Sequence, residues 1–132
     1  LAKKLAADAQ RNIEILAADL SDSSDLAKLE QILRSDSRIT LLVNNAGVGA
    51  TPRLLNSDAA DMSRMIMLNV QALTWLTHAV APGFVKRGSG TIINIASTVA
   101  IGPESSNAVY AGTKGLFSLS PNPCGMIWLT PE

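Results

Sequence analysis

The sequence is short of residues that mark several classes of protein. It has one cysteine, Cys124, so no disulfide can form within the chain, and a reducing, cytoplasmic compartment is the expected setting. Its one histidine, His78, has no metal-ligand partner at a suitable spacing, which favours a structural role and predicts no metal site. The formal net charge is zero, so the chain has no electrostatic footprint for nucleic acid or an anionic membrane.

Long apolar runs are also missing. Stretches such as Ile39–Val43, which Thr40 interrupts, are far shorter than the roughly 18 residues that a membrane-spanning helix needs. No signal-peptide hydrophobic region begins the sequence. Apolar residues make up 47% and charged residues 17% of the 132 positions, a composition that favours one domain with a buried core and argues against disorder.

The apolar pattern alternates between strands and helices. Helical spacing or composition marks residues 1–9, 26–33, 58–84 and 107–119, whereas Ile13–Ala17, Ile39–Val43 and Thr91–Ala96 are typical of strands. This alternation predicts an α/β fold with a parallel sheet over residues 1–119. Residues 120–132 contain Pro121 and Pro123, which cannot continue a helix, so we expect an atypical tail outside the ordered α/β unit.

Tyr110 and Lys114 are the most informative pair. Their spacing of four places both side chains on one face of a helix, one turn apart. An ammonium group beside a phenol stabilises the phenolate, so the tyrosine can exchange a proton closer to neutral pH than a free phenol does. The pair is therefore a candidate acid/base catalyst.

Further candidates lie upstream of this pair in a fixed order. Asp19-Leu20 follows the first predicted strand, Asn44-Asn45-Ala46-Gly47 ends the second, Asn69-Val70 lies in the long helix, and Ser97 follows the third strand. The carboxyl ends of strands in an open α/β sheet are where ligands bind. Small residues such as Ala46 and Gly47 would let the backbone approach a ligand there.

Taken together, these motifs resemble those of the short-chain dehydrogenase/reductase family, in its short soluble type, from Leu1 to about Leu119. The resemblance implies a Rossmann-type, doubly wound parallel sheet and an NAD(P)-dependent oxidoreductase that interconverts a carbonyl and a secondary alcohol by hydride transfer. It implies a small-molecule substrate, no nucleic acid or membrane partner, and a homo-dimer or homo-tetramer in the complete protein.

The resemblance also implies a role for each matched residue. Tyr110 would be the acid/base group, Lys114 would bind the nicotinamide ribose, Ser97 would hold the substrate oxygen, and Asn69 would anchor a water of a proton relay. Asp19 would accept from the adenine amino group. The expected cofactor-binding residues are Asp19, Leu20, Asn44, Asn45, Ala46, Gly47, Val70, Tyr110 and Lys114, and the expected catalytic residues are Asn69, Ser97, Tyr110 and Lys114.

Ordinary structural roles are the alternatives at several of these positions. Asn44-Asn45-Ala46-Gly47 suits a plain turn. Asp19 suits a helix N-cap, Asn69 suits a buried hydrogen bond at a helix kink, and Ser97 suits a turn at a strand end.

The chain departs from the family pattern at both ends. The glycine-rich loop of the family is absent, and the first two strands and the C-terminal strands are expected to be missing, so the sequence does not distinguish NAD from NADP. An alternative function is therefore a catalytically inactive fragment, or a non-enzymatic association module without a cofactor site. A sugar-nucleotide epimerase or dehydratase of the longer type shares the Tyr/Lys pair but is disfavoured by Asn44-Asn45-Ala46-Gly47.

Overall fold

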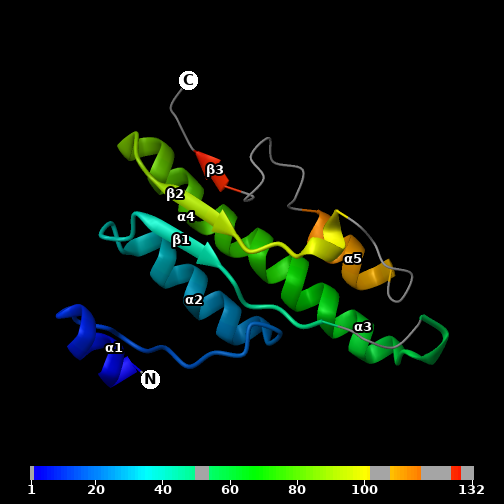
Figure 1. Ribbon diagram of the computed structural model, residues 1–132. Helices are drawn as coiled ribbons and strands as arrows, with labels where there is room; N and C mark the ends of the chain where they lie inside the picture. The colour runs from blue at the N-terminus through cyan, green and yellow to red at the C-terminus, as the bar shows by residue number, and fades with distance from the viewer. Residues whose placement is uncertain (1, 50–53, 102–107, 117–125, 129–132) are drawn as a thin grey trace.

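A three-stranded sheet lies at the centre of the computed structural model, which describes residues 2–49, 54–101, 108–116 and 126–128 (Figure 1). Strand β1 (Leu41–Asn44) pairs in parallel with β2 (Thr91–Asn94), and β3 (Met126–Trp128) pairs in antiparallel orientation with the other edge of β2. The expected α/β class is confirmed, but the sheet is mixed rather than wholly parallel.

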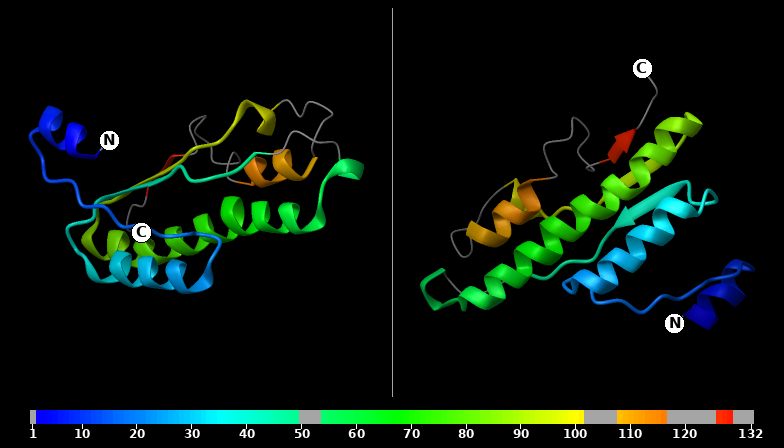
Figure 2. Two further views of the ribbon diagram at one scale, coloured as in Figure 1. Left: turned by 90° about the horizontal axis from the view of Figure 1, so that it is seen from below. Right: turned by 180° about the vertical axis from the view of Figure 1, so that it is seen from behind.

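Helices connect and cover these strands. The main ones are α1 (Ala2–Ala9), α2 (Ser23–Ser35), α3 (Ala59–Ile66), α4 (Leu73–Arg87) and α5 (Ala108–Gly115), with the 3-10 turns η1 (Leu54–Asn56) and η3 (Thr98–Ala100). A π-helical segment, η2 (Met67–Ala72), joins α3 to α4, so that one long helix leads from β1 to β2. Figure 2 shows α2 and α4 side by side on one face of the sheet, with α5 on the other side of the long helix from α2.

Local capping explains where the helices begin and end. The Asp22 side chain accepts from the backbone N–H groups of Ser24 and Asp25 at the start of α2, and the Asp58 side chain accepts from that of Ala60 at the start of α3. The long helix ends at Arg87 because Gly88 adopts a left-handed conformation, with φ of 66°.

The core lies between the sheet and the pair of helices α2 and α4. One buried cluster contains Leu26, Ala72 and Leu76, and a second contains Val80, Phe84 and Ile92. Leu33 and Leu42 pack against both clusters and so join them. Along β1 the side chains alternate between the two faces of the sheet, so Leu42 packs toward the helices whereas Leu41 is 50% exposed on the opposite face.

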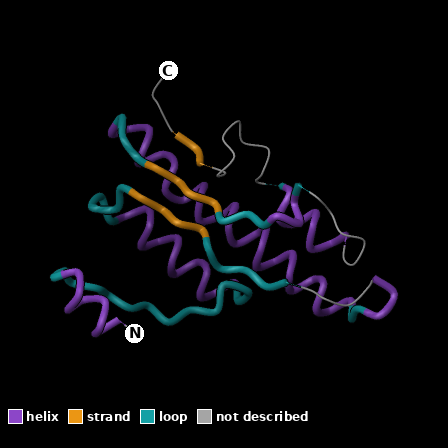
Figure 3. Tube along the Cα trace, in the orientation of Figure 1, coloured by secondary structure: helices purple, strands orange, loops and turns teal. Residues whose placement is uncertain are grey.

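The prediction of a strand at Ile13–Ala17 is wrong. Residues 12–19 form an extended loop without strand pairing (Figure 3). Ile15, within this loop, is 75% exposed. An apolar run becomes a strand only when a neighbouring strand satisfies its backbone groups. The sheet of the described residues consists of β1, β2 and β3 in that order, and none of these strands pairs with residues 12–19.

The expectation that nothing after Leu119 belongs to the ordered unit is also wrong for Met126–Trp128. The backbone of this segment pairs with the outer edge of β2, in the register Ile93↔Met126 to Thr91↔Trp128. An unpaired strand edge presents N–H and C=O groups that a short apolar segment can satisfy. Cys124 and the rest of the predicted tail lie outside the described residues.

Candidate active site

Asn44 ends β1 and ties the two parallel strands together. Its side chain is 8% exposed, and its Nδ2 donates to Oδ1 of Asn94 on β2 at 2.9 Å and to Oγ1 of Thr77 on α4 at 3.1 Å. A buried amide needs such partners, because an unsatisfied one costs free energy. These bonds fix the point at which residues 45–49 leave the sheet.

Asn69 lies in the π-helical segment η2 and is 3% exposed. Its Oδ1 accepts from the backbone N–H of Val48 at 2.9 Å, and its Nδ2 donates to the carbonyl oxygen of Val48 at 2.8 Å. This two-point contact holds the segment after β1 against the long helix. Asn69 therefore makes a buried structural hydrogen bond, and its role in a proton relay stays a prediction.

Helix α5 brings Tyr110 and Lys114 to the same segment, and both side chains are half-buried. Nζ of Lys114 donates to the carbonyl oxygen of Ile95, just beyond β2, at 3.2 Å. A methyl group placed on Gly49 would lie 3.7 Å from Cζ and 3.9 Å from the hydroxyl oxygen of Tyr110. The tyrosine and the lysine thus share one face of α5, as their spacing predicts, and this face lies against residues 47–49.

Ser97 precedes η3 and caps it. Its Oγ accepts from the backbone N–H of Val99 at 3.5 Å, and η3 packs against α5. The half-buried hydroxyl therefore lies on the element next to the helix that carries Tyr110. Ser97 serves as a turn serine, and its contact with a substrate oxygen stays a prediction.

Gly47 marks the point where these groups come closest. A Cβ at this position would lie 3.0 Å from Oδ1 of Asn69 and 3.1 Å from Nζ of Lys114, closer than nearly all Cβ contacts in proteins. Only glycine leaves this space open without displacing the amide or the ammonium group. The exposed backbone of residues 45–49 fits a nicotinamide cofactor, because a ligand can approach it there. The neighbouring Lys114 ammonium can donate to a ribose hydroxyl.

For the acid/base role that the spacing of Tyr110 and Lys114 predicts, the substitution Gly47→Ala is expected to lower turnover by about tenfold or more, because it displaces Asn69 and Lys114 by a few tenths of an ångström. Gly49→Ala is the matched variant, since its Cβ makes only ordinary contact with the Tyr110 ring at 3.7 Å. We expect a smaller loss for Gly49→Ala. Steady-state kinetics of both variants check this order, and an equal loss in the two would contradict it.

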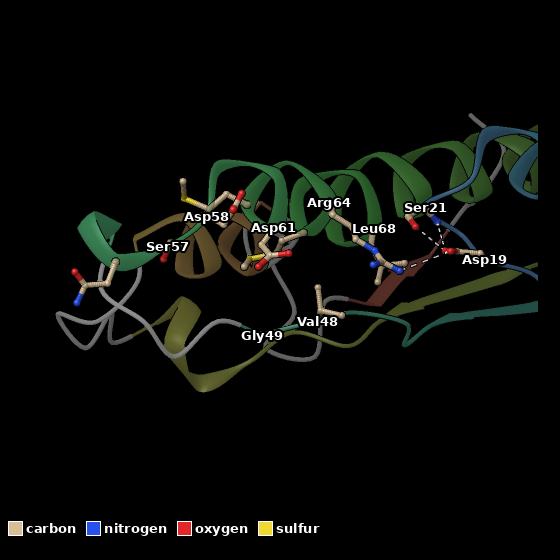
Figure 4. A pocket seen from close by; sticks show the side chains of 12 residues that line it. Asp19, Ser21, Val48, Gly49, Ser57, Asp58, Asp61, Arg64 and Leu68 are labelled. Atoms are coloured by element: carbon tan, nitrogen blue, oxygen red, sulfur yellow. Dashed lines mark hydrogen bonds and ion pairs between the residues drawn. The ribbon is translucent and has the colours of Figure 1, made fainter.

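A groove of about 610 Å³ runs from Asp19 along the long helix to the segment after β1. Figure 4 shows Asp19 and Arg64 at one end, Ser57 at the other, and Val48 between them. Oδ1 of Asp19 accepts from Oγ of Ser21 at 2.6 Å and from its backbone N–H at 2.9 Å, and Nη2 of Arg64 lies 3.7 Å from Oδ2. The carboxylate expected to bind adenine is thus held at the groove's end.

These hydrogen bonds from Ser21, helped by the Arg64 charge, hold the pKa of the Asp19 carboxyl below its ordinary value of 3.8. Because the folded-state pKa is depressed, the stabilisation is present above pH 3.8 and is lost as the pH falls through the lower folded value. Ser21→Ala is expected to raise this pKa toward 3.8.

Carboxyl NMR titration of both proteins measures that shift. Ser24→Ala is the matched control, because the Ser24 hydroxyl donates to Asp22 and not to Asp19. An Asp19 titration that is the same with and without the Ser21 hydroxyl would contradict the assignment of the cause.

The remaining predicted cofactor residues lie at different depths. Asn45 and Ala46 are exposed, whereas Leu20 is half-buried and packs against the core cluster of Leu26. Val70 is half-buried in η2, where its carbonyl oxygen accepts from Oγ1 of Thr74 at 2.7 Å. The place of Val70 in the site stays a prediction.

Sequence reasoning missed two threonines that support the site. Thr77 bonds Asn44, and Thr113 bonds Asn69, yet neither belongs to the motif that drew attention to its neighbours. The only available signal was a polar residue at an apolar position of a helix face.

Over the described ranges, no group of three His, Cys, Asp or Glu residues could hold a metal ion. His78 is exposed, with Nδ1 3.4 Å from Nη2 of Arg34 on α2. Among the helices of those ranges, we find none with the length and apolar character that crossing a membrane requires.

Comparison with known proteins gives consistent matches. A family model described as short chain dehydrogenase matches residues 1–118. The chain is similar to an NADP-dependent 3-hydroxy acid dehydrogenase of Shigella flexneri, with 36% identity over 128 residues, 84% of this chain and 51% of that protein. The protein of the same name from Escherichia coli strain K12 is 35% identical, with the same coverage of both chains. The chain thus spans about half the length of these curated relatives.

Two solved structures are similar in fold as well as sequence. One is the bulky-bulky ketone specific alcohol dehydrogenase from Comamonas testosteroni, with a TM-score of 0.83, 38% identity, and coverage of 86% of this chain and 46% of that chain. The other is a short-chain dehydrogenase from Sphingobium yanoikuyae in complex with NADPH, with a TM-score of 0.83, 42% identity, and coverage of 86% and 45%. These similarities confirm the Rossmann-type α/β fold.

Proposed function

Because this chain belongs to the short-chain dehydrogenase family, we propose that it supplies the catalytic half of an NAD(P)-dependent oxidoreductase that interconverts a carbonyl compound and a secondary alcohol. The observation that carries this proposal is the convergence of Asn69, Tyr110 and Lys114 on residues 47–49. These side chains come from two separate helices, and the segment after β1 lies against both.

Tyr110 acts as the acid/base group. When bound, the nicotinamide supplies a hydride to the carbonyl carbon and accepts one in the reverse reaction. The Tyr110 hydroxyl gives its proton to the carbonyl oxygen, and the Lys114 ammonium stabilises the phenolate that remains. Ser97 holds the substrate oxygen through its Oγ and stabilises the charge that develops there.

The residues that would hold the cofactor run from Gly47 and Lys114 to Asp19. The Asp19 carboxylate would accept from the adenine amino group, and Leu20, Asn44, Asn45, Ala46, Gly47 and Val70 would hold the rest of the nucleotide. NADP is the cofactor that the relatives favour, since one is named as NADP-dependent and another was solved with NADPH.

The substrate is a ketone or the corresponding secondary alcohol. This class is supported by the names of two relatives, which specify a 3-hydroxy acid and a bulky ketone. Residues 1–119 act as one dinucleotide-binding unit within a homo-dimer or homo-tetramer. The single cysteine fits a reducing, cytoplasmic compartment.

Titration of the folded chain with NADPH and with NADH, followed by nicotinamide fluorescence, tests the proposal. We expect saturable binding of NADPH in the micromolar range, with circular dichroism confirming the helices of the free protein. Absence of binding to a folded chain would mean that these residues form no cofactor site by themselves, and would favour the inactive fragment or association module.

A further inference from the structure

Thr113 is a polar residue that the proposed reaction leaves unexplained. It is 5% exposed and is the only residue of α5 that is buried in the described structure. A helix of eight residues is marginal on its own, so its position depends on tertiary contacts. Apolar side chains usually provide those contacts, but here the buried contact is a hydroxyl group.

The Thr113 hydroxyl joins α5 to Asn69. Its Oγ1 accepts from Nδ2 of Asn69 at 3.1 Å and donates to the backbone carbonyl oxygen of Tyr110 at 2.8 Å. One oxygen atom therefore connects the π-helical segment to the backbone of the residue expected to transfer the proton.

Asn69 completes the connection to the segment after β1. Its amide nitrogen has two hydrogens, one directed to Thr113 and the other to the carbonyl oxygen of Val48, while its Oδ1 accepts from the Val48 N–H. Rotating this side chain would break all three bonds in a buried environment, which is costly. The bonds thus run without interruption from Val48 through Asn69 and Thr113 to Tyr110.

We propose that Thr113 is a positioning residue that fixes Tyr110 and Lys114 relative to the segment after β1, through its hydrogen bond with Asn69. Its importance for catalysis rests on the proposed function, but the connection itself is a property of the chain without cofactor. A side chain of the same shape that lacks the hydroxyl would leave α5 packed but not aligned, because helix packing alone permits small shifts along the interface.

Thr113→Val and Thr113→Ser separate the hydroxyl from the shape of the side chain. Valine keeps the branched shape and removes both hydrogen bonds, whereas serine keeps the hydroxyl and removes a methyl group. Tyr110 is the only tyrosine, so 3-fluorotyrosine incorporation gives one ¹⁹F NMR resonance that reports its environment without turnover. We expect Thr113→Val to shift or split this resonance and Thr113→Ser to retain the wild-type signal.

Thr113→Ala replaces the valine variant if valine does not fold. In an activity assay, loss of the hydroxyl is expected to lower kcat about 10- to 100-fold with a much smaller rise in the KM for NADPH, because Lys114 moves with the same helix, and serine is expected to restore both. A folded variant without the hydroxyl that keeps the wild-type resonance would overturn the proposal, as would a serine variant that matches valine. Failure of the proposed function is seen separately, as absence of NADPH oxidation by the unsubstituted chain.

Discussion

Replacing Tyr110 with phenylalanine is expected to lower the rate of NADPH-dependent ketone reduction by about 10²- to 10⁴-fold, the contribution typical of a positioned acid/base group. The phenol oxygen is the only atom group removed, and the ring next to Gly49 remains. The fold should therefore be retained, because the Thr113 hydroxyl bonds the backbone of residue 110 and not its side chain. Initial rates at saturating NADPH measure the loss.

Two controls separate chemistry from binding in this variant. The free energy of unfolding should differ by no more than about 1 kcal/mol between the two proteins, because one hydrogen bond contributes about that much net. NADPH affinity should change much less than the rate. A Tyr110→Phe protein that reduces ketone within a factor of about two of the unsubstituted chain would show that another group delivers the proton.

The substitution with the largest expected effect on stability is Gly90→Ala, just before β2. A Cβ at this position would overlap Cγ and Cδ2 of Phe84 and lie 2.5 Å from its Cβ. Phe84 is 1% exposed and packs with Val80 and Ile92, so it has no space into which to move. We expect a loss of about 3 kcal/mol or more in the free energy of unfolding, at the upper end of overpacking effects.

Gly112→Ala is the matched control, since a Cβ there would meet nothing within 4 Å. Alanine is the better helix former, so this variant should be neutral or more stable by up to about 1 kcal/mol. Denaturant unfolding of the two variants measures the difference. Unfolding of Gly90→Ala and Gly112→Ala at the same denaturant concentration would contradict the close packing of Phe84 against the backbone of residue 90.

Local signals in the sequence predicted elements whose determinants are local. Helical spacing over residues 26–33 predicts α2, whose first turn begins a few residues earlier, where the Asp22 side chain caps it through bonds to the backbone N–H groups of Ser24 and Asp25. The facing of Tyr110 and Lys114 likewise follows from helical spacing alone. Ile13–Ala17 failed because a strand is defined by its neighbour, and pairing partners are not encoded in the segment itself.

The supporting contacts of the site depend on tertiary structure in the same way. The π-helical segment at Asn69 does not disturb the apolar spacing of the long helix, so no sequence pattern distinguished it from an ordinary α-helix. The sequence does not distinguish Thr113 from other threonines in helices, because its bond with Asn69 forms only when α5 packs against η2. The shared helix face of Tyr110 and Lys114 was therefore predictable, whereas the bond between Thr113 and Asn69 was not.

Deuterium tracing tests hydride transfer to a ketone most directly. The folded chain is incubated with NADPH deuterated at the transferring carbon and a prochiral ketone, and the alcohol is analysed by mass spectrometry. Hydride transfer predicts one deuterium on the carbinol carbon of each alcohol formed, with formation almost abolished by Tyr110→Phe. A folded chain that binds NADPH and yields no deuterated alcohol from a range of ketones would contradict it.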